Sequence, residues 1–185
     1  LKIQRINITA NKTWKDNSNV KGKRPISIKL QLKNGEQIIQ EKLVTGNTTT
    51  NEGWSYTFTD LPKYNAEGNE IVYTVDEAEV NTNDLKFYTK KVEGNSITNA
   101  FTVPDEKISV TVNKIWEDNL NANKKRPTSV KLQVKNGTKI VKEQEISGNV
   151  TTNEGWDYTF TDLPKYNAEG NEIVYTVDET CLLYT

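Results

Sequence analysis

The feature that most constrains this chain is a repeat of domain length. The segment 49–77 recurs as 151–179 with a single substitution. Other matches keep the same spacing of 102 residues, without insertion or deletion between the copies. A period near 100 residues is that of a whole domain and is longer than the unit of a solenoid. The sequence therefore predicts two tandem domains joined by the short linker 103–107, with the boundaries 1–104 and 105–185.

Each copy is predicted to be a β-sandwich. Apolar and polar residues alternate over short segments, which are separated by Asn-Gly, Gly-Asn and proline turns. Threonine, asparagine, valine and tyrosine are abundant, and no long segment has helical periodicity. About seven strands are expected in the first copy, at 6–14, 28–32, 38–44, 54–58, 71–77, 87–92 and 97–103. Strands at this spacing are typical of an all-β, antiparallel Ig-like sandwich.

The second copy is predicted to lack its last strands. It stops matching the first copy after Glu179, so segments 87–92 and 97–103 have no equivalents. The tail 180–185 contains the only cysteine, Cys181, and we interpret it as a truncation or as residues introduced in cloning. A sheet that has lost its edge strands can accept a strand from a neighbouring chain.

The composition excludes several classes of function. There is no histidine and only one cysteine, which removes Cys/His zinc sites, the usual Ser-His and Cys-His nucleophile pairs and internal disulfides. Charged residues make up 26% of the chain, the net charge is −1 and the lysines are scattered, so neither a nucleic acid nor a membrane surface is expected as a partner. The acidic loop after Trp14 does not fit the EF-hand template. We expect no metal and no cofactor.

Three polar side chains occupy positions at which the strand pattern favours apolar ones. Lys12 lies in the apolar phase of the first strand, Glu77 in that of a late strand and Asn99 in that of the last strand. First and last strands of such sandwiches are commonly neighbours, so convergence is plausible. In the simplest interpretation each residue lies at a solvated strand end, or the lysine and glutamate form a buried ion pair that adds little stability. In the second copy Lys114, in the equivalent strand, and Glu179 take the same positions.

A second interpretation of these residues is chemical. Burial lowers the pKa of a lysine, so the Lys12 amine can be neutral and nucleophilic. Glu77 in the same apolar pocket can stay protonated, hydrogen-bond the side-chain carbonyl of Asn99 and polarise it. Attack of Lys12 Nζ on Asn99 Cγ, with loss of ammonia and Glu77 as the proton carrier, would join the first and last strands by an amide.

Five short motifs occur together in the first copy, at 12–14 (Lys-Thr-Trp), 23–25 (Lys-Arg-Pro), 54–64 (Trp-x-Tyr-x-Phe-x-x-Leu-Pro-Lys-Tyr), 73–77 (Tyr-Thr-Val-Asp-Glu) and 97–99 (Ile-Thr-Asn). This set resembles the B-type repeats of the staphylococcal collagen adhesin, which are inverse Ig-like (prealbumin-like) modules of Gram-positive surface adhesins and pilins. The resemblance implies a stalk module with a self-generated Lys–Asn isopeptide bond that an acidic residue promotes. Those roles fall on Lys12, Asn99 and Glu77, and in the second copy on Lys114 and Glu179.

We therefore expect a structural stalk repeat of an adhesin that is anchored to the cell wall at a bacterial surface. Its partners would be the neighbouring repeats of the same chain, and a host matrix ligand would bind other domains. The second copy has no equivalent of Asn99, so one cross-link per chain is expected, with Lys114 unpaired by any acceptor and Glu179 idle. These two side chains would remain as a buried ion pair or be solvated at the open edge. The alternative is a direct adhesion module that binds a host matrix protein or a glycan. An enzyme with turnover is not expected, because the inferred reaction consumes the protein's own residues.

Overall fold

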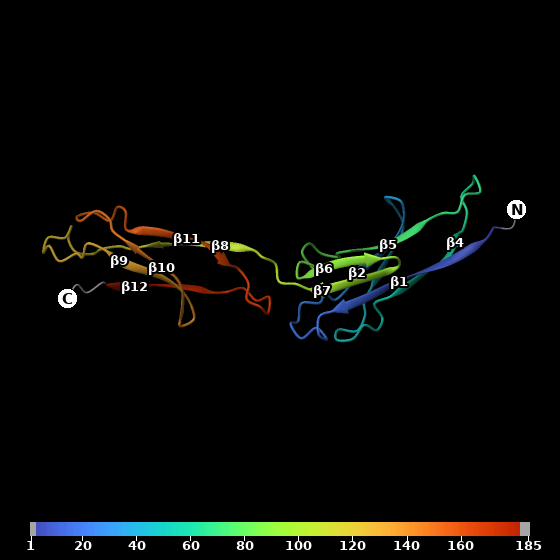
Figure 1. Cartoon of the computed structure of the whole chain (residues 1–185), viewed down its shortest axis with the longest axis horizontal. Coiled ribbons are helices and arrows are strands. Elements are labelled where there is room, and N and C mark those ends of the chain that lie inside the picture. The colour runs from blue at the N-terminus through green and yellow to red at the C-terminus, as the bar shows by residue number, and fades with distance from the viewer. Residues whose placement is uncertain (1–2, 182–185) are drawn as a thin grey trace. The chain divides into compact units, whose positions relative to one another are not determined.

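The computed structural model describes residues 3–181, and all the regular elements in that range are strands (Figure 1). Across this range no helix has the length and apolar character needed to cross a membrane. The chain divides into two compact units, of which unit 1 ends at Pro104 and unit 2 begins at Asp105. Unit 1 holds β1 (Arg5–Lys15), β2 (Ile28–Asn34), β3 (Gln37–Val44), β4 (Tyr56–Pro62), β5 (Tyr73–Ala78), β6 (Tyr88–Glu93) and β7 (Ser96–Phe101). Unit 2 holds β8 (Lys107–Asn113), β9 (Val130–Asn136), β10 (Lys139–Ile146), β11 (Asp157–Pro164) and β12 (Tyr175–Cys181).

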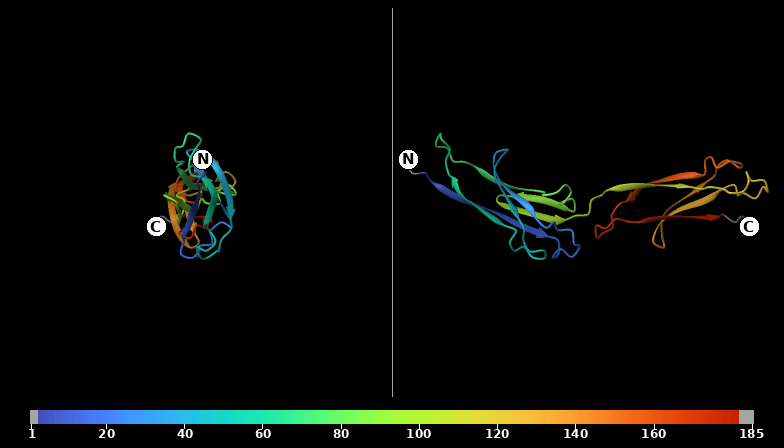
Figure 2. Two further views of the ribbon diagram at one scale, coloured as in Figure 1. Left: turned by 90° about the vertical axis from the view of Figure 1, so that its right-hand side faces the viewer. Right: turned by 180° about the vertical axis from the view of Figure 1, so that it is seen from behind.

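Unit 1 is an all-β sandwich of two sheets. One sheet has the strand order β4-β1-β7-β6 and the other β3-β2-β5. All neighbouring strands are antiparallel except β1 and β7, the first and last strands, which run parallel and side by side (Figures 1 and 2). β1 changes partner along its length, pairing with β4 as far as Ala10 and with β7 from Asn11 to Lys15.

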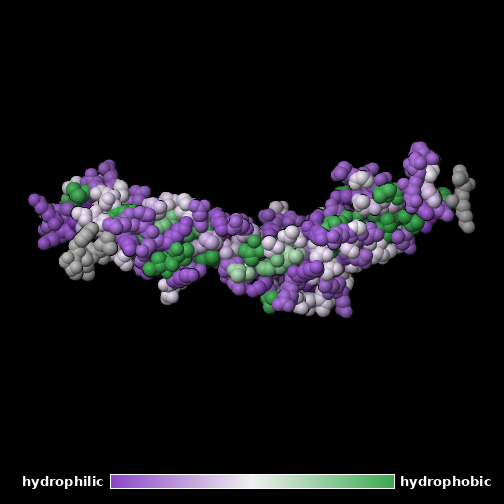
Figure 3. All heavy atoms as spheres, in the orientation of Figure 1, coloured by the Kyte–Doolittle hydropathy of each residue, from purple (hydrophilic) through white to green (hydrophobic). Residues whose placement is uncertain are grey.

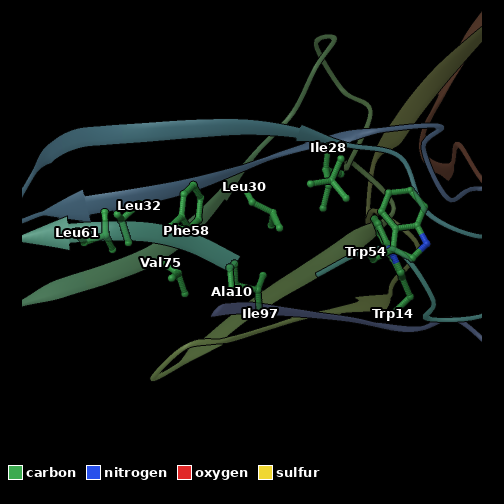
Figure 4. Close-up of a cluster of buried hydrophobic side chains, with 11 residues drawn as sticks. Ala10, Trp14, Ile28, Leu30, Leu32, Trp54, Phe58, Leu61, Val75 and Ile97 are labelled. Atoms are coloured by element: carbon green, nitrogen blue, oxygen red, sulfur yellow. The ribbon is translucent and has the colours of Figure 1, made fainter. Parts of the chain in front are cut away.

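The core of unit 1 consists of the inward-facing apolar side chains of both sheets (Figure 4). Leu30 and Leu32 of β2 are fully buried, as are Phe58 of β4 and Ile97 of β7 to within 1%. This is the alternation that the sequence shows, since every second residue of a strand faces the same side of the sheet. The core therefore lies between β2 and β5 on one side and β1, β4 and β7 on the other.

Two tryptophans close one end of this core. The rings of Trp14 and Trp54 meet edge to face, with centroids 5.2 Å apart. A Cβ added at Gly46 would lie 2.5 Å from the Trp54 ring, so only glycine fits beneath it. The same arrangement recurs in unit 2, where Trp116 and Trp156 also lie 5.2 Å apart.

Unit 2 repeats the sandwich with fewer described strands. It has a sheet β10-β9-β12 and a two-stranded sheet β11-β8, and its core contains Leu132, Val134 and Phe160. The expectation that Lys114 lies within the first strand of this copy is wrong, because β8 ends at Asn113. The reason is visible in unit 1, where the second half of β1 is held by β7. In the described part of unit 2, no strand pairs with β8 on that side.

The C-terminal tail continues β12 for two residues. Thr180 pairs with Lys131 and Cys181 with Val130. Residues 182–185, to which the interpretation of the tail also refers, lie outside the described residues.

Candidate cross-linking site

Three different strands bring Lys12, Glu77 and Asn99 together in unit 1. In the parallel ladder between β1 and β7, Lys12 lies opposite Ile97 and Trp14 opposite Asn99. Lys12 and Asn99 are therefore diagonal neighbours on the inward face, since residues two apart on a strand face the same side. Glu77 reaches them from β5 in the facing sheet, where it lies opposite Leu30 of β2.

Glu77 lies between the other two side chains. Its Oε2 is 3.1 Å from Lys12 Nζ, and its Oε1 accepts a hydrogen bond of 2.7 Å from Asn99 Nδ2. The side chains of Lys12 and Glu77 have no exposed surface, and Asn99 is also fully buried. The interpretation of these residues as solvated strand ends is therefore wrong.

The orientation of the Asn99 amide differs from the one that the chemical interpretation expects. That interpretation places the glutamate on the amide oxygen, whereas the amide nitrogen donates to Glu77 and Oδ1 is buried without a hydrogen-bond partner. An ionised carboxylate only accepts hydrogen bonds, so beside a charged lysine it faces the NH₂ group. Glu77 Oε2 likewise has no hydrogen bond, because its contact with Lys12 is close but not aligned as one. A half-turn of the amide would bring Oδ1 to a protonated Glu77.

The surroundings of Lys12 disfavour its charge. Burial lowers its pKa from 10.5 to about 8, although the neighbouring Glu77 acts in the opposite direction. Besides Glu77, Nζ has a long contact of 3.4 Å with the carbonyl of Thr13 and lies 4.0 Å from the centre of the Trp14 ring. With a pKa near 8, about a tenth of the amine is neutral and nucleophilic at pH 7.

A second buried polar cluster, which sequence reasoning missed, also lies beside Trp14, with Arg24 Cζ 5.3 Å from the centre of its ring. Arg24 donates to both carboxylate oxygens of Asp16, over 2.9 and 2.6 Å, and to the carbonyls of Asn47 and Thr50. Tyr88 of β6 donates to the same Asp16 at 3.0 Å. Burial on its own would raise the pKa of Asp16, but the hydrogen bonds from Arg24 and the other donors lower it overall. The cluster ties the loop after β1 to β6.

A sequence signal for this cluster existed. Arg24 belongs to the Lys-Arg-Pro motif, which entered the sequence argument only as a mark of resemblance. Asp16 and Arg24 recur with the same spacing as Asp118 and Arg126. In unit 2 that pair also makes two hydrogen bonds, of 2.9 and 2.6 Å. An aspartate and an arginine that recur at the same spacing in both copies could therefore have been predicted to form an ion pair.

Unit 2 holds the lysine and the glutamate but a more open site. Lys114 Nζ lies 3.0 Å from Glu179 Oε1, and the two side chains are 20% and 41% exposed. The structure has an ion pair between these residues, as in the first of the two expected states, but its side chains are partly solvated, as in the second. Lys114 Nζ also lies 4.3 Å from the centre of the Trp116 ring, close to the 4.0 Å between Lys12 Nζ and Trp14. In residues 3–181, no group of three or more histidine, cysteine or acidic side chains is placed to hold a metal ion.

The fold and the site define a class of protein: tandem all-β sandwich domains, with a lysine, a glutamate and an asparagine buried together in unit 1. The chain belongs to the Cna protein B-type domain family, whose sequence model matches residues 8–100 and 110–184. The match therefore covers both units.

A particular relative is the collagen adhesin of Staphylococcus aureus. It is 38% identical over 178 residues, which is 96% of this chain but only 14% of that protein. Two solved structures of the collagen-binding surface protein of S. aureus are similar at 35% identity. The first, a single B repeat unit, has a TM-score of 0.46, with 97% of this chain and 88% of that chain covered. The second contains two B repeat units and has a TM-score of 0.46, with 98% and 44% covered.

Proposed function

We propose that this chain is a structural stalk segment of a surface adhesin, and that unit 1 is cross-linked by an isopeptide bond between Lys12 and Asn99. The observation that carries the proposal is the fully buried contact of Glu77 with both residues, at 3.1 and 2.7 Å. A buried ion pair alone contributes little to stability, and an uncharged pair of similar volume would pack as well. With Asn99 beside it, the ion pair can instead serve a reaction in which Asn99 is attacked by Lys12.

The reaction needs only these three side chains. Lys12 transfers a proton to Glu77, which leaves a neutral amine and a carboxylic acid. The amide of Asn99 turns so that Oδ1 accepts a hydrogen bond from that acid, and Nζ attacks Cγ. As the C–N bond of the amide breaks, Glu77 returns its proton and Nδ2 leaves as ammonia. Glu77 then takes the proton that Nζ loses on becoming an amide nitrogen and passes it to the departing ammonia, which leaves as ammonium. Glu77 is thereby regenerated as a carboxylate.

Folding supplies the driving geometry for this step. The strand ladder holds the Lys12 and Asn99 side chains on one face of the sheet, both in contact with Glu77 and closed to solvent, which gives them a high effective concentration. Because unit 1 reacts once on itself, the process is a maturation step without turnover. The proposed bond lies in unit 1 alone.

A stalk role fits the position of the bond. It joins the first strand to the last and so encloses nearly the whole unit. We place the chain outside the cell, among neighbouring repeats, with ligand binding left to other regions. Two facts support this: the family is that of adhesin repeats, and this chain spans a small part of a relative described as a collagen adhesin.

Intact mass spectrometry tests the cross-link directly. The wild-type chain is expected to weigh less than its sequence by one ammonia. Lys12→Ala and Asn99→Ala chains should have their full sequence mass. A wild-type chain at full mass would refute the proposal, and so would an unchanged deficit in Lys12→Ala.

Direct adhesion remains the alternative, and one observation favours it. β3 lies at a sheet edge and exposes Ile38, Ile39 and Leu43 by 41–56%. On the face that Figure 3 shows, hydrophobic residues form small groups among largely hydrophilic ones. Binding of the chain to immobilised matrix proteins and glycans would distinguish the two functions. A stalk segment should not bind, whereas an adhesion module should bind and should lose binding in Leu43→Asp.

A further inference from the structure

A lysine that does not react joins the two sheets of unit 1 beside the cross-linking site. Lys90 of β6 lies directly opposite Asn99 of β7 in the antiparallel ladder, so both side chains leave the same face of the sheet. Lys90 Nζ donates hydrogen bonds to Asp76 Oδ1, over 2.5 Å, and to the main-chain carbonyl of Glu77, over 3.0 Å. Lys90 therefore connects the strand next to the amide acceptor with the strand that carries the glutamate.

Both strands that Lys90 connects are edge strands. β6 is last in the order β4-β1-β7-β6, and β5 is last in the order β3-β2-β5. Main-chain groups on the outer side of an edge strand have no neighbouring strand to pair with. For Glu77 side chains take that place, because its N–H donates to Asp76 Oδ1 over 2.8 Å and its carbonyl accepts from Lys90. The main chain of Glu77 is therefore held at the edge by two side chains instead of a strand.

Asp76 is itself held by a second lysine. Its Oδ2 accepts a hydrogen bond of 2.5 Å from Lys33 Nζ of β2, so its carboxylate contacts two lysines. Burial alone would raise the pKa of Asp76, but the hydrogen bonds from Lys33 and Lys90 and the nearby charges lower it to about 2. The carboxylate thus stays charged at neutral pH and links β2, β5 and β6.

The proposed reaction changes both side-chain contacts of Glu77. Proton transfer from Lys12 neutralises the ion pair at Oε2, and the half-turn of the Asn99 amide breaks the hydrogen bond at Oε1. The contact between Lys90 and the Glu77 carbonyl takes no part in these steps, since it involves the main chain and a side chain that does not react. This contact can therefore hold β5 and β6 together while the reacting side chains rearrange.

We propose that Lys90 is a positioning residue for the cross-linking reaction, an inference that rests on the proposed function of unit 1. By fixing the main chain of Glu77 to the strand beside Asn99, Lys90 keeps the carboxyl group within reach of both Lys12 Nζ and the Asn99 amide. A displacement of reacting groups by about 1 Å can slow a reaction by as much as about a hundredfold.

The charge of Lys90 also favours the reactive form of Lys12. The charged groups that act on Lys12 are Glu77 on β5, Arg24 in the loop after β1 and Lys90 on β6. Burial lowers the pKa of Lys12 most, Glu77 raises it, and the positive charges of Arg24 and Lys90 lower it further. Lys90 therefore increases the fraction of neutral amine.

The rate of ammonia loss tests this role. Full-length chains are isolated unfolded in urea, diluted into buffer, quenched with acid at intervals and weighed intact, and a zero-time sample gives the starting mass. At about pH 9.5, where most of the Lys12 amine is neutral, Lys90→Met should react about tenfold more slowly than the wild type, because positioning is lost. At about pH 7 the ratio should grow to about thirtyfold, because the pKa of Lys12 rises and its neutral fraction falls roughly threefold. The final mass should be that of the wild type less the difference of the substitution, because the three reacting side chains remain.

Two further variants of β6 are the controls. Lys90→Arg keeps the charge and the donors, so it should react within about threefold of the wild-type rate. Lys91→Met removes the adjacent lysine, whose side chain is 70% exposed and lies 2.7 Å from Glu93, and it should react as the wild type does. Circular dichroism shows whether each diluted chain is folded, and Lys90→Gln, which is polar and uncharged, replaces Lys90→Met if that variant does not fold.

The outcomes separate this inference from the proposed function. If the wild type loses ammonia and folded Lys90→Met loses it at the same rate, the role of Lys90 is refuted and the cross-link stands. Equal slowing by Lys91→Met, or a Lys90→Arg chain as slow as Lys90→Met, also refutes that role. A ratio that is the same at both pH values refutes the effect of the charge and leaves positioning. A wild-type chain that keeps its full mass refutes the proposed function and, with it, any role of Lys90 in that reaction.

Discussion

At the scale of single residues, the unusual feature of unit 1 is a lysine without exposed surface whose partner is equally buried. Removing a charge from water is costly, and the cost shows in the pKa of Lys12, which burial lowers to about 8. The same burial makes the amine a nucleophile. An apparent defect in the packing of the core is therefore the condition for the proposed bond.

The role of Glu77 as a proton carrier can be isolated by one substitution. Glu77→Gln keeps the size of the side chain and a hydrogen-bond acceptor for Asn99 but cannot take up a proton. We expect this variant to keep the full sequence mass. Asp76→Asn is the matched control, because Asp76 is the adjacent residue and contacts Lys33 and Lys90 instead. It should lose one ammonia, and a Glu77→Gln chain that also loses ammonia would contradict the assigned role.

The titration of Lys12 gives a second prediction at this scale. In the unreacted Asn99→Ala variant, the pKa of Lys12 is taken as about 8 when folded and 10.5 when unfolded. Between these values the unfolded state binds more protons, so the free energy of unfolding should rise with pH. The full rise is roughly 3 kcal/mol, present above pH 10.5 and absent below pH 8.

Urea unfolding of unit 1 between pH 7 and 9.5 measures this rise. The double variant Lys12→Met/Asn99→Ala lacks the amine and is the control, so the difference between the two variants isolates Lys12. Parallel curves for both would show that Lys12 titrates normally. The wild-type chain should resemble the double variant in slope, because an amide nitrogen does not titrate in this range.

At the scale of elements, much of the fold could be predicted, because period-two alternation and turn residues report directly on strands. The inward positions of Lys12, Glu77 and Asn99 could be predicted from the alternation of inward and outward residues along each strand. Whether these side chains touch could not be predicted, because the alternation along a strand does not show which strands are neighbours. The end of β8 at Asn113 was also unpredictable from its own sequence, since its pattern continues to Trp116 and only the missing partner strand stops it.

The buried pair of Asp16 and Arg24 is predicted to hold β1, its following loop and β6 together. Asp16→Ala would leave the guanidinium of Arg24 buried and unpaired, which typically costs about 3–5 kcal/mol. Asp118→Ala in unit 2 should cost less, because that aspartate is 28% exposed and water can replace it. Urea unfolding in the uncross-linked Asn99→Ala background measures both costs. Equal losses in the two units would contradict the idea that burial sets the difference.

At the scale of the whole molecule, the proposed bond changes how unit 1 responds to force. Residues 13–98 lie between the two linked side chains, so they are bypassed when the unit is pulled from its ends. By analogy with a disulfide that closes a loop of this length, the bond should add about 4–5 kcal/mol to stability in the loop-entropy model.

Single-molecule pulling tests the bypass. A Lys12→Ala unit should extend on unfolding by about 300 Å more than the wild-type unit, which is the extended length of residues 13–98. Unit 2 of the same molecule is the control, because its extension should be the same in both chains. An equal extension of unit 1 in the wild type and in Lys12→Ala would show that no covalent bond lies in the path of the force.

The parallel pairing of β1 with β7 also sets an order of events in time. Lys12 lies in the first strand of unit 1 to be synthesised and Asn99 in the last strand of that unit, so the amine has no acceptor until the whole of unit 1 is in place. A chain that stalls, misfolds or is cut before β7 docks keeps the amide nitrogen of Asn99. The loss of one ammonia is therefore an irreversible mark that unit 1 reached its native fold, and it occurs once in each molecule.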